Sequence, residues 1–496
     1  MKYLLALDQG TTSSRALLFN QFGEVIGKSQ IGTQSLFPKM GWVEQDPEDI
    51  WRTQLESLQT VVLESRVDLG DIEGLGIANQ RETTVVWERK TGKPIYNAIV
   101  WQDRRTATLC EQLKAKGLET TLQAKTGLCL DPYFSATKIN WILENVTHAK
   151  QLAEAGDLLF GTIDTWLLWK LTEGAVHATD PTNASRTLLF DIHTQTWDET
   201  LLNIFEIPKT MLPEVRPSSS VYGYTSEAIL GRRVPIAGMA GDQQAAAFGQ
   251  NCVHPGMAKN TYGTGCFALL HTGTNAVASK HRLLTTLGCT VDGRASYHLE
   301  GSMFTAGASI EWLRDGLKLV SSANEVEKLA NSVPDAGGVY LVPGFTGLGA
   351  PYWDPLARGA LMGLGRETRP GHIARATLEA MAYQVYDVFQ AMKADTQMPL
   401  TELRVDGGVS KSDTLMQFQA DLLGIPIVRP RMTEVTAVGA VRLAGLALGV
   451  WNATDEAQPI DRIFEPKMDE SERQPLLLGW QKAIQRSMNW LEEGQP

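Results

Sequence analysis

Residues 7–19, LDQGTTSSRALLF, join two apolar runs through a short polar turn, and this stretch decides the fold. The first run, Tyr3 to Leu7, ends at Asp8-Gln9-Gly10, which predicts a buried strand followed by a tight turn. The second run, Ala16 to Phe19, follows within a few residues. Two close strands joined by Gly, Thr and Ser residues predict a β-hairpin with a polar tip.

A similar hairpin is predicted about half a chain later, at residues 260–270, NTYGTGCFALL. In both copies a Gly-Thr pair precedes Ala-Leu-Leu, and the second loop is one residue shorter. Two similar units this far apart indicate an internal duplication. Strand and helix patterns alternate along the rest of the chain, so we expect an α/β protein. The expected domains are residues 1–250 and 251–496, packed face to face with a cleft between them.

Composition excludes several classes of protein. The 496 residues contain 45 Lys and Arg against 56 Asp and Glu, a net charge of −11, which argues against a nucleic-acid binder. The first apolar run ends at Asp8 and no long uncharged apolar stretch follows, so neither a signal peptide nor membrane insertion is expected. Five cysteines without a CxxC pair make a disulfide framework or zinc site unfavourable. These features predict a cytoplasmic location.

Two helices can be placed from their patterns. Asp46 can cap a helix over Pro47 to Glu64, whose apolar residues recur at helical spacing. A similar stripe from Leu476 to Leu491 predicts a packed final helix.

The two predicted turns carry groups that suit phosphate. Hydroxyls and amides of a Thr- and Ser-rich turn can donate to phosphate oxygens, Arg15 adds a positive charge, and Asp8 can hold hydrated Mg²⁺. An ordinary polar turn with internal hydrogen bonds is the alternative for either hairpin alone. The second turn favours the phosphate interpretation, because two turns that face each other across a cleft would hold one polyphosphate from both sides.

Three further features have a functional and a structural interpretation. Asp242 lies at a strand-to-helix junction, where its carboxylate can accept a hydroxyl proton during phosphoryl transfer or cap the helix. Arg81-Glu82 and Trp101 can bind a polyol, or can form a surface ion pair beside a core aromatic. Gly407-Gly408 can let adenine lie against bare backbone, or can provide a turn that needs a positive φ.

These motifs resemble the FGGY family of carbohydrate kinases, and within it the glycerol kinases, which belong to the actin/hexokinase/Hsp70 fold group. The resemblance runs from Leu7 to about Leu446. Its most specific segments are LDQGTTSSRALLF (7–19), NQRETTVVW (79–87), WQDRRT (101–106), DPYFSATKINWIL (131–143), AGDQQAA (240–246), NTYGTGCFALLHTG (260–273), GFTGLGAPYWDPLARGALMGL (344–364) and VDGG (405–408).

The resemblance implies a fold and an activity. The fold would be two duplicated ribonuclease H-like domains, the first with the glycerol site and one phosphate turn, the second with the other turn and the adenosine site. The activity would be direct in-line transfer from ATP to glycerol, giving ADP and sn-glycerol 3-phosphate, with Mg²⁺ as cofactor. A homodimer or homotetramer is implied as well. A kinase for another polyol or sugar is the nearest alternative, and a nucleotide-dependent sensor without turnover is a more distant one.

The resemblance also implies a role for individual residues. Asp242 would be the general base, and Asp8 and Asp242 would organise Mg²⁺ through water. The glycerol-binding residues would be Arg81, Glu82, Trp101, Tyr133, Asp242, Gln243 and Phe267, with Trp101 and Phe267 against the carbon chain. The ATP-binding residues would be Thr11, Thr12, Ser13, Arg15, Thr264, Gly307, Glu311, Gly408 and Ser412. Glu311 and Ser412 depart from the family pattern, which has Gln and Asn there, so both bear on nucleotide affinity.

Overall fold

The stretch at residues 7–19 forms the predicted hairpin in the computed structural model, which describes residues 1–291, 293–452 and 459–491. Strand β1 (Tyr3–Gln9) pairs antiparallel with β2 (Ser13–Asn20), and Asp8 lies opposite Arg15. The turn is closed by the Gly10 amide, which donates to the Ser13 carbonyl at 2.9 Å. The apolar residues of both strands are buried, so burial on both faces fixes the hairpin.

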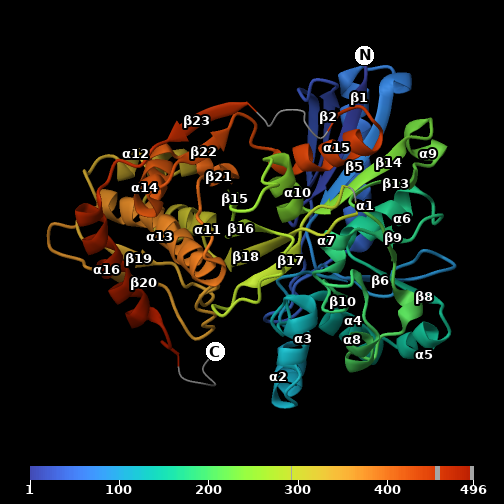
Figure 1. Cartoon of the computed structure of the whole chain (residues 1–496), viewed down its shortest axis with the longest axis horizontal. Helices are drawn as coiled ribbons and strands as arrows, with labels where there is room; N and C mark the ends of the chain where they lie inside the picture. Colours follow the sequence, from blue (N-terminus) through green and yellow to red (C-terminus); the bar gives the residue numbers. More distant parts are fainter. Residues whose placement is uncertain (292, 453–458, 492–496) are drawn as a thin grey trace.

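This hairpin lies at the centre of a six-stranded sheet in the N-terminal half (Figure 1). Strands β1 and β5 are parallel, as are β5 and β14, whereas β2 and β3 continue antiparallel from β1. The strand order is β13 (Ser219–Tyr224), β14 (Pro235–Gly241), β5 (Ile72–Asn79), β1, β2 and β3 (Val25–Gly32).

The C-terminal half repeats this arrangement. Strand β15 pairs antiparallel with β16, which pairs antiparallel with β18, while β15, β21 and β22 run parallel. The strand order is β17 (Leu284–Leu287), β18 (Tyr297–Met303), β16 (Cys266–Gly273), β15 (Ala258–Tyr262), β21 (Leu403–Asp406), β22 (Ile427–Pro430) and β23 (Ile460–Phe464). Each half therefore contains three adjacent antiparallel strands, the first of which continues into two further strands parallel to it. The duplicated α/β fold is confirmed.

Helix α15 (Val435–Ala447) links the two halves in an unexpected way. It comes from the C-terminal half of the sequence, yet it packs on β1, β5 and β14 of the first sheet, and Figure 1 draws it in red-orange beside the blue strands. The contact is close, because a Cβ on Gly76 would lie 2.1 Å from the Ala440 carbonyl oxygen and one on Gly439 would lie 1.8 Å from that of Ala245. Only glycine allows this approach. The expected domain boundary at residue 250 stays a prediction. The last residues of the expected second domain, 492–496, lie outside the described part of the chain.

Both predicted helices form, the first within one residue of its expected end and the final one shifted toward the N-terminus, so that Leu491 of the predicted stripe lies beyond it. Asp46 accepts the Glu48 amide at 2.9 Å and caps α1 (Pro47–Ser65), and the final helix is α16 (Glu470–Ser487). The other helices are α2 (Ala107–Ala115), α3 (Glu119–Thr126), α4 (Ser135–Asn145), α5 (Ala149–Glu154), α6 (Ile163–Leu171), α7 (Pro181–Ala184), α8 (Glu199–Ile204), α9 (Glu227–Leu230), α10 (Asp242–Gly249), α11 (Gly307–Glu311), α12 (Ala323–Ala330), α13 (Pro370–Thr396) and α14 (Asp413–Leu423).

Five two-stranded sheets complete the fold of the described residues. They pair β4 (Glu44–Gln45) with β7 (Ala98–Ile99), β6 (Val85–Glu88) with β8 (Leu158–Gly161), β9 (Ala178–Thr179) with β12 (Glu214–Val215), β10 (Phe190–Asp191) with β11 (Thr196–Trp197), and β19 (Tyr340–Val342) with β20 (Ala360–Met362).

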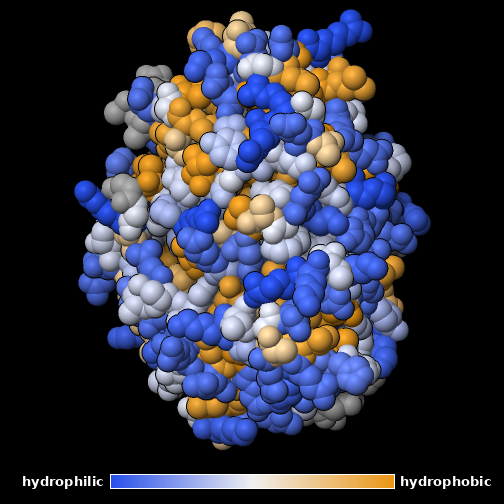
Figure 2. Space-filling view, turned by 90° about the vertical axis from the view of Figure 1, so that its right-hand side faces the viewer, coloured by the Kyte–Doolittle hydropathy of each residue, from blue (hydrophilic) through white to orange (hydrophobic). Residues whose placement is uncertain are grey.

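One face of the molecule is mostly hydrophilic (Figure 2). Figure 2 shows one face on which polar and charged residues predominate and apolar residues are dispersed in small groups. Among the described residues, no helix is long and apolar enough to cross a bilayer.

Candidate active site

The two hairpin turns present similar groups. Thr12 and Thr264 are exposed at the tips of the first and second turn, and the second turn is closed by the Gly263 amide bonding to the Gly265 carbonyl at 2.9 Å. Ser13 is buried and accepts from Gln30 Nε2 at 3.1 Å. Thr11 is half-buried and accepts from the Trp101 indole nitrogen at 2.9 Å. The carbonyl of Thr12 accepts the Thr33 amide at 3.0 Å and that of Thr264 accepts the Ala306 amide at 2.8 Å, so the backbone of each turn is anchored while its threonine stays exposed.

Asp8 and Arg15 form a charged pair at the base of the first turn. Arg15 Nη1 lies 3.3 Å from Asp8 Oδ2 and 2.9 Å from Glu434, the residue just before α15. Burial raises the pKa of Asp8, and Arg15 opposes that shift. A buried carboxylate beside a phosphate-sized turn is suited to hold a hydrated cation.

Asp242 is the first residue of α10 and follows directly on β14. Its side chain is 30% exposed, its Oδ1 accepts the Gln243 amide at 2.7 Å, and Arg81 Nε lies 3.4 Å away. Burial raises its pKa, Arg81 and Lys259 oppose the shift, and the nearby Asp8 carboxylate adds to it. Asp242 therefore accepts a hydrogen bond from the start of its own helix. Its carboxylate is also partly exposed and has a raised pKa, as a general base requires.

The interpretation of Arg81-Glu82 as a surface ion pair is wrong, because both side chains are buried. Glu82, at φ 60°, accepts from Arg186 Nε at 2.5 Å. Both nitrogens of the Arg81 fork donate to Glu300, at 2.6 and 2.8 Å. The sequence analysis missed Arg186 and Glu300. A usable signal was the lone carboxylate within the otherwise uncharged strand β18.

Three aromatic side chains from different parts of the chain meet beside these charges. The Trp101 ring lies 5.6 Å from Tyr133 and 6.2 Å from Phe267, both edge-on. Phe267 belongs to β16 of the C-terminal half, so the two halves share this apolar wall. The structure brings together all three aromatic residues that the resemblance assigned to one substrate.

Gln243 has a partner that the sequence analysis did not identify. The buried Lys259 ammonium, on β15, donates to Gln243 Oε1 and to Thr261 Oγ1. Burial lowers the pKa of Lys259, and Asp406 and Asp242 oppose that shift. Lys259 therefore holds the Gln243 amide in place, and its positive charge acts on Asp242.

The residues assigned to adenosine gather around the second turn. The Gly307 amide donates to the Gly263 carbonyl at 2.9 Å. Gly407 has φ 88°, and a Cβ there would lie 2.3 Å from the Tyr262 carbonyl oxygen, so the turn interpretation holds for Gly407. A Cβ on Gly408 would meet no atom within 4 Å. Open backbone at Gly408 leaves room for a flat ring.

The two residues that depart from the family pattern differ in setting. Glu311 is exposed at the end of α11. Ser412 caps α14, accepting from the Leu415 amide at 3.3 Å, and its hydroxyl donates to Glu327 at 2.9 Å. The Ser412 side chain is thus occupied within the protein.

The donors present fit hydrated Mg²⁺. Among the described residues, no cluster of three or more His, Cys, Asp or Glu side chains could enclose a metal ion. Mg²⁺ is usually held by one or two carboxylates together with water and substrate phosphates, which matches the Asp8 and Asp242 pair.

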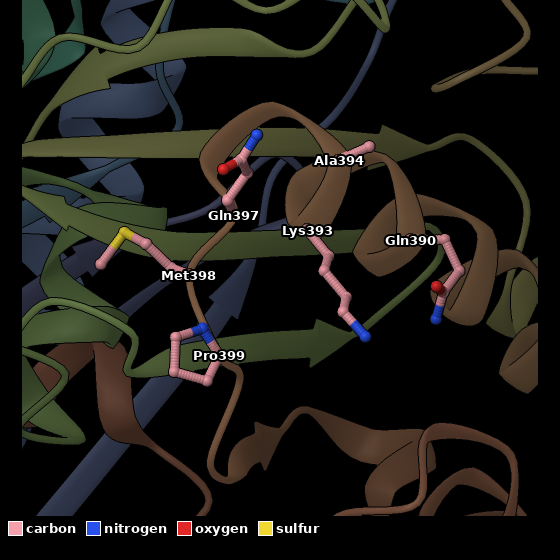
Figure 3. A pocket seen from close by; sticks show the side chains of 6 residues that line it. All are labelled: Gln390, Lys393, Ala394, Gln397, Met398 and Pro399. Atoms are coloured by element: carbon pink, nitrogen blue, oxygen red, sulfur yellow. The ribbon is translucent and has the colours of Figure 1, made fainter.

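A surface pocket lies elsewhere, at the C-terminal end of α13 (Figure 3). It encloses about 520 Å³ and is lined by Gln390, Lys393, Ala394, Gln397, Met398 and Pro399. These side chains include none of the predicted site residues, so we do not assign this pocket to the chemistry.

Close relatives of the chain are known. A glycerol kinase from Caldanaerobacter subterraneus subsp. tengcongensis is 55% identical over 495 residues, covering 99% of this chain and 100% of the relative. One from Shewanella frigidimarina is 56% identical over 486 residues, 97% of each chain.

Solved structures agree with the sequence relatives. The ADP-bound glycerol kinase of Plasmodium falciparum superposes with a TM-score of 0.92 at 36% identity and 98% coverage of both chains. A gluconate kinase from Lactobacillus acidophilus, at 23% identity and a TM-score of 0.86, shares the fold. The models for the N- and C-terminal domains of the FGGY family of carbohydrate kinases match residues 3–249 and 258–448. By this match over most of its length, the chain belongs to the FGGY family of carbohydrate kinases.

Proposed function

We propose that this chain transfers the γ-phosphoryl group of ATP to glycerol, giving ADP and sn-glycerol 3-phosphate. The observation that carries the proposal is the partly exposed Asp242 carboxylate, 3.4 Å from Arg81 Nε, together with the aromatic wall formed by Trp101, Tyr133 and Phe267. A small polyol fits such a site, since charged groups bind hydroxyls and aromatic edges cover carbon. The high identity to glycerol kinases over nearly the whole chain supports the same acceptor.

The acceptor hydroxyl is activated by Asp242. Arg81, Glu82, Tyr133 and Gln243 orient the glycerol hydroxyls, and the Asp242 carboxylate takes the proton of the attacking one. Because the base must be ionised, kcat/KM falls as the pH drops through the pKa of Asp242, which burial holds above its usual range.

The donor is held by groups from both halves. Thr11, Thr12, Ser13 and Arg15 meet the β- and γ-phosphates from one side and Thr264 from the other, while Gly307, Glu311, Gly408 and Ser412 line the nucleoside. Asp8 and Asp242 would hold Mg²⁺ through water, and the bound ion would supply charge neutralisation of the phosphates. Most of the rate enhancement comes from positioning and charge stabilisation rather than covalent chemistry.

Location and assembly are part of the same proposal. A kinase of a central metabolite with five free cysteines suits the cytoplasm. We expect a homodimer or homotetramer, which light scattering of the purified protein tests.

The activity is tested by ADP release from Mg²⁺-ATP with glycerol, dihydroxyacetone, erythritol, xylulose or gluconate as acceptor. We expect strong release with glycerol and little without an acceptor. Preference for a sugar would keep the mechanism and overturn the acceptor. ATP binding without release for any acceptor would favour a sensor.

The base is tested by Asp242→Asn. We expect kcat to fall about 10²- to 10⁴-fold, the range for loss of a general base, while both substrates still bind by calorimetry. Retained turnover would show that another group takes the proton.

A further inference from the structure

Four charged side chains form a buried cluster under the proposed acceptor site. Arg81, Glu82, Arg186 and Glu300 are each at most 3% exposed. Two positive and two negative charges make the cluster neutral. Three members come from the N-terminal half, and Glu300 comes from β18 of the C-terminal sheet. A buried charge without a partner is expensive, so each member depends on the others.

Glu300 makes the connections that order this cluster. Its carboxylate accepts both Nη groups of Arg81, at 2.6 and 2.8 Å, and lies 3.2 Å from Arg186 Nη2. A two-point contact fixes the plane of a guanidinium group. With both Nη groups engaged, Arg81 presents its remaining Nε to Asp242 Oδ1, 3.4 Å away.

The carboxyl group of Glu300 is ionised. Burial alone would raise its pKa, but Arg186 and Arg81 outweigh burial and hold the pKa at about 2. The carboxylate therefore stays ionised throughout the working range. It pairs with the guanidinium groups of Arg81 and Arg186, and the first of these lies beside Asp242.

We propose that Glu300 is a positioning residue for phosphoryl transfer: from the C-terminal sheet it holds Arg81 in the orientation that presents Nε to the base Asp242. The inference rests on the proposed function, since it assumes that Asp242 is the base. It also makes the base depend on contact between the two halves, because Glu300 lies on β18 of the C-terminal sheet and Asp242 begins α10 in the N-terminal half.

The proposal is tested by the steady-state kinetics of Glu300→Gln and Glu300→Asp. In Glu300→Gln the charged two-point contact with Arg81 is lost, so Nε no longer keeps a fixed orientation toward Asp242. We expect kcat to fall at least tenfold and the KM for glycerol to rise, with the KM for ATP within twofold of the wild type. Glu300→Asp keeps the charge but shortens the side chain, so kcat should fall in this variant too, again with little change in the KM for ATP.

The matched control is Glu44→Gln. Glu44 is 2% exposed and lies 2.7 Å from the buried Arg105, in a separate ion pair. Its loss should lower the thermal unfolding midpoint without changing kcat or the KM for glycerol. A role limited to stability predicts that Glu300→Gln behaves like Glu44→Gln, and that result would overturn the proposal. If Glu300→Gln does not fold, an Asp variant with wild-type kcat would overturn it equally.

ADP release by the wild-type protein with different acceptors separates the proposed substrate from the proposed role of Glu300. Turnover with an acceptor other than glycerol would overturn the proposed substrate, and the Glu300 variants would then be measured with that acceptor. Absence of transfer to any acceptor would overturn both proposals together.

Discussion

At the scale of single residues, the site depends on where the backbone leaves room. Gly407 and Gly408 are neighbours in sequence, yet only Gly407 is enclosed, with a positive φ and the Tyr262 carbonyl behind it. Gly408 faces open space. Gly407 is therefore needed for the backbone conformation of the turn, whereas Gly408 leaves the backbone surface bare.

This difference predicts opposite effects of two alanine substitutions. Gly407→Ala should destabilise the protein by about 3 kcal/mol, because the new Cβ meets backbone in a conformation that L residues rarely adopt. Gly408→Ala should change the free energy of unfolding by less than about 1 kcal/mol but raise the KM for ATP. Urea unfolding and steady-state kinetics of both variants check this. Equal destabilisation by the two would contradict the structural difference.

Residue chemistry was predictable where it is local. The Thr-rich turns, Asp242 at its junction and the aromatic residues were found because each carries its own signal in sequence. Glu300, Arg186 and Lys259 were not found, because their roles arise from partners: Arg81 and Glu300 are 219 positions apart. Sequence spacing carries no sign of such a pair, and only the packing of the two sheets creates it.

At the scale of elements, α16 shows how a terminal helix is fixed. Trp480 is fully buried, stacks on Tyr383 of α13 with ring centroids 5.1 Å apart, and donates to Asp387 at 2.6 Å. The aromatic contact and the hydrogen bond together anchor α16 on α13. The helix itself was predicted from its apolar stripe, whereas the surface that receives it was not.

Removing this anchor should release α16. We expect Trp480→Ala to lower the free energy of unfolding by about 3–5 kcal/mol, as for other large-to-small changes of buried aromatics, and to expose the C-terminal segment to protease. Leu478→Ala on the same helix is the control, since Leu478 is 54% exposed and its loss should have little effect. Equal protease sensitivity of the two variants would contradict anchoring by Trp480.

At the scale of the whole molecule, each half of the chain forms its own sheet, but a helix from the C-terminal half covers the sheet of the N-terminal half. Helix α15 closes the first sheet from the far end of the sequence, and its cluster includes Leu4, Leu17 and Phe19 of the central hairpin. Glu300 and Phe267 add further contacts from the second half to the first. The duplication was predictable from the repeated hairpins, but the crossing of α15 was not, because its small-residue sequence does not specify which sheet it covers.

This crossing predicts that residues 1–250 do not fold stably alone. Without α15, the apolar residues that it covers face water, so the fragment should bind a hydrophobic dye and aggregate. A fusion that adds residues 435–447 through a flexible linker should reduce dye binding, because it restores the missing layer. Circular dichroism and size-exclusion chromatography of both proteins check this. A monomeric fragment with cooperative unfolding would contradict it.

The position of α15 in the sequence also determines how long the first sheet stays incomplete during synthesis. Strand β14 ends roughly 190 residues before α15 begins, so a ribosome adding about 5–20 residues per second leaves one face of the first sheet uncovered for about 10–40 s. During that interval the nascent chain presents an apolar face to the crowded cell. The sheet of the N-terminal half is therefore complete only when α15, the second-last helix among the described residues, has been synthesised. We expect chaperones to bind the uncovered face of this sheet during translation.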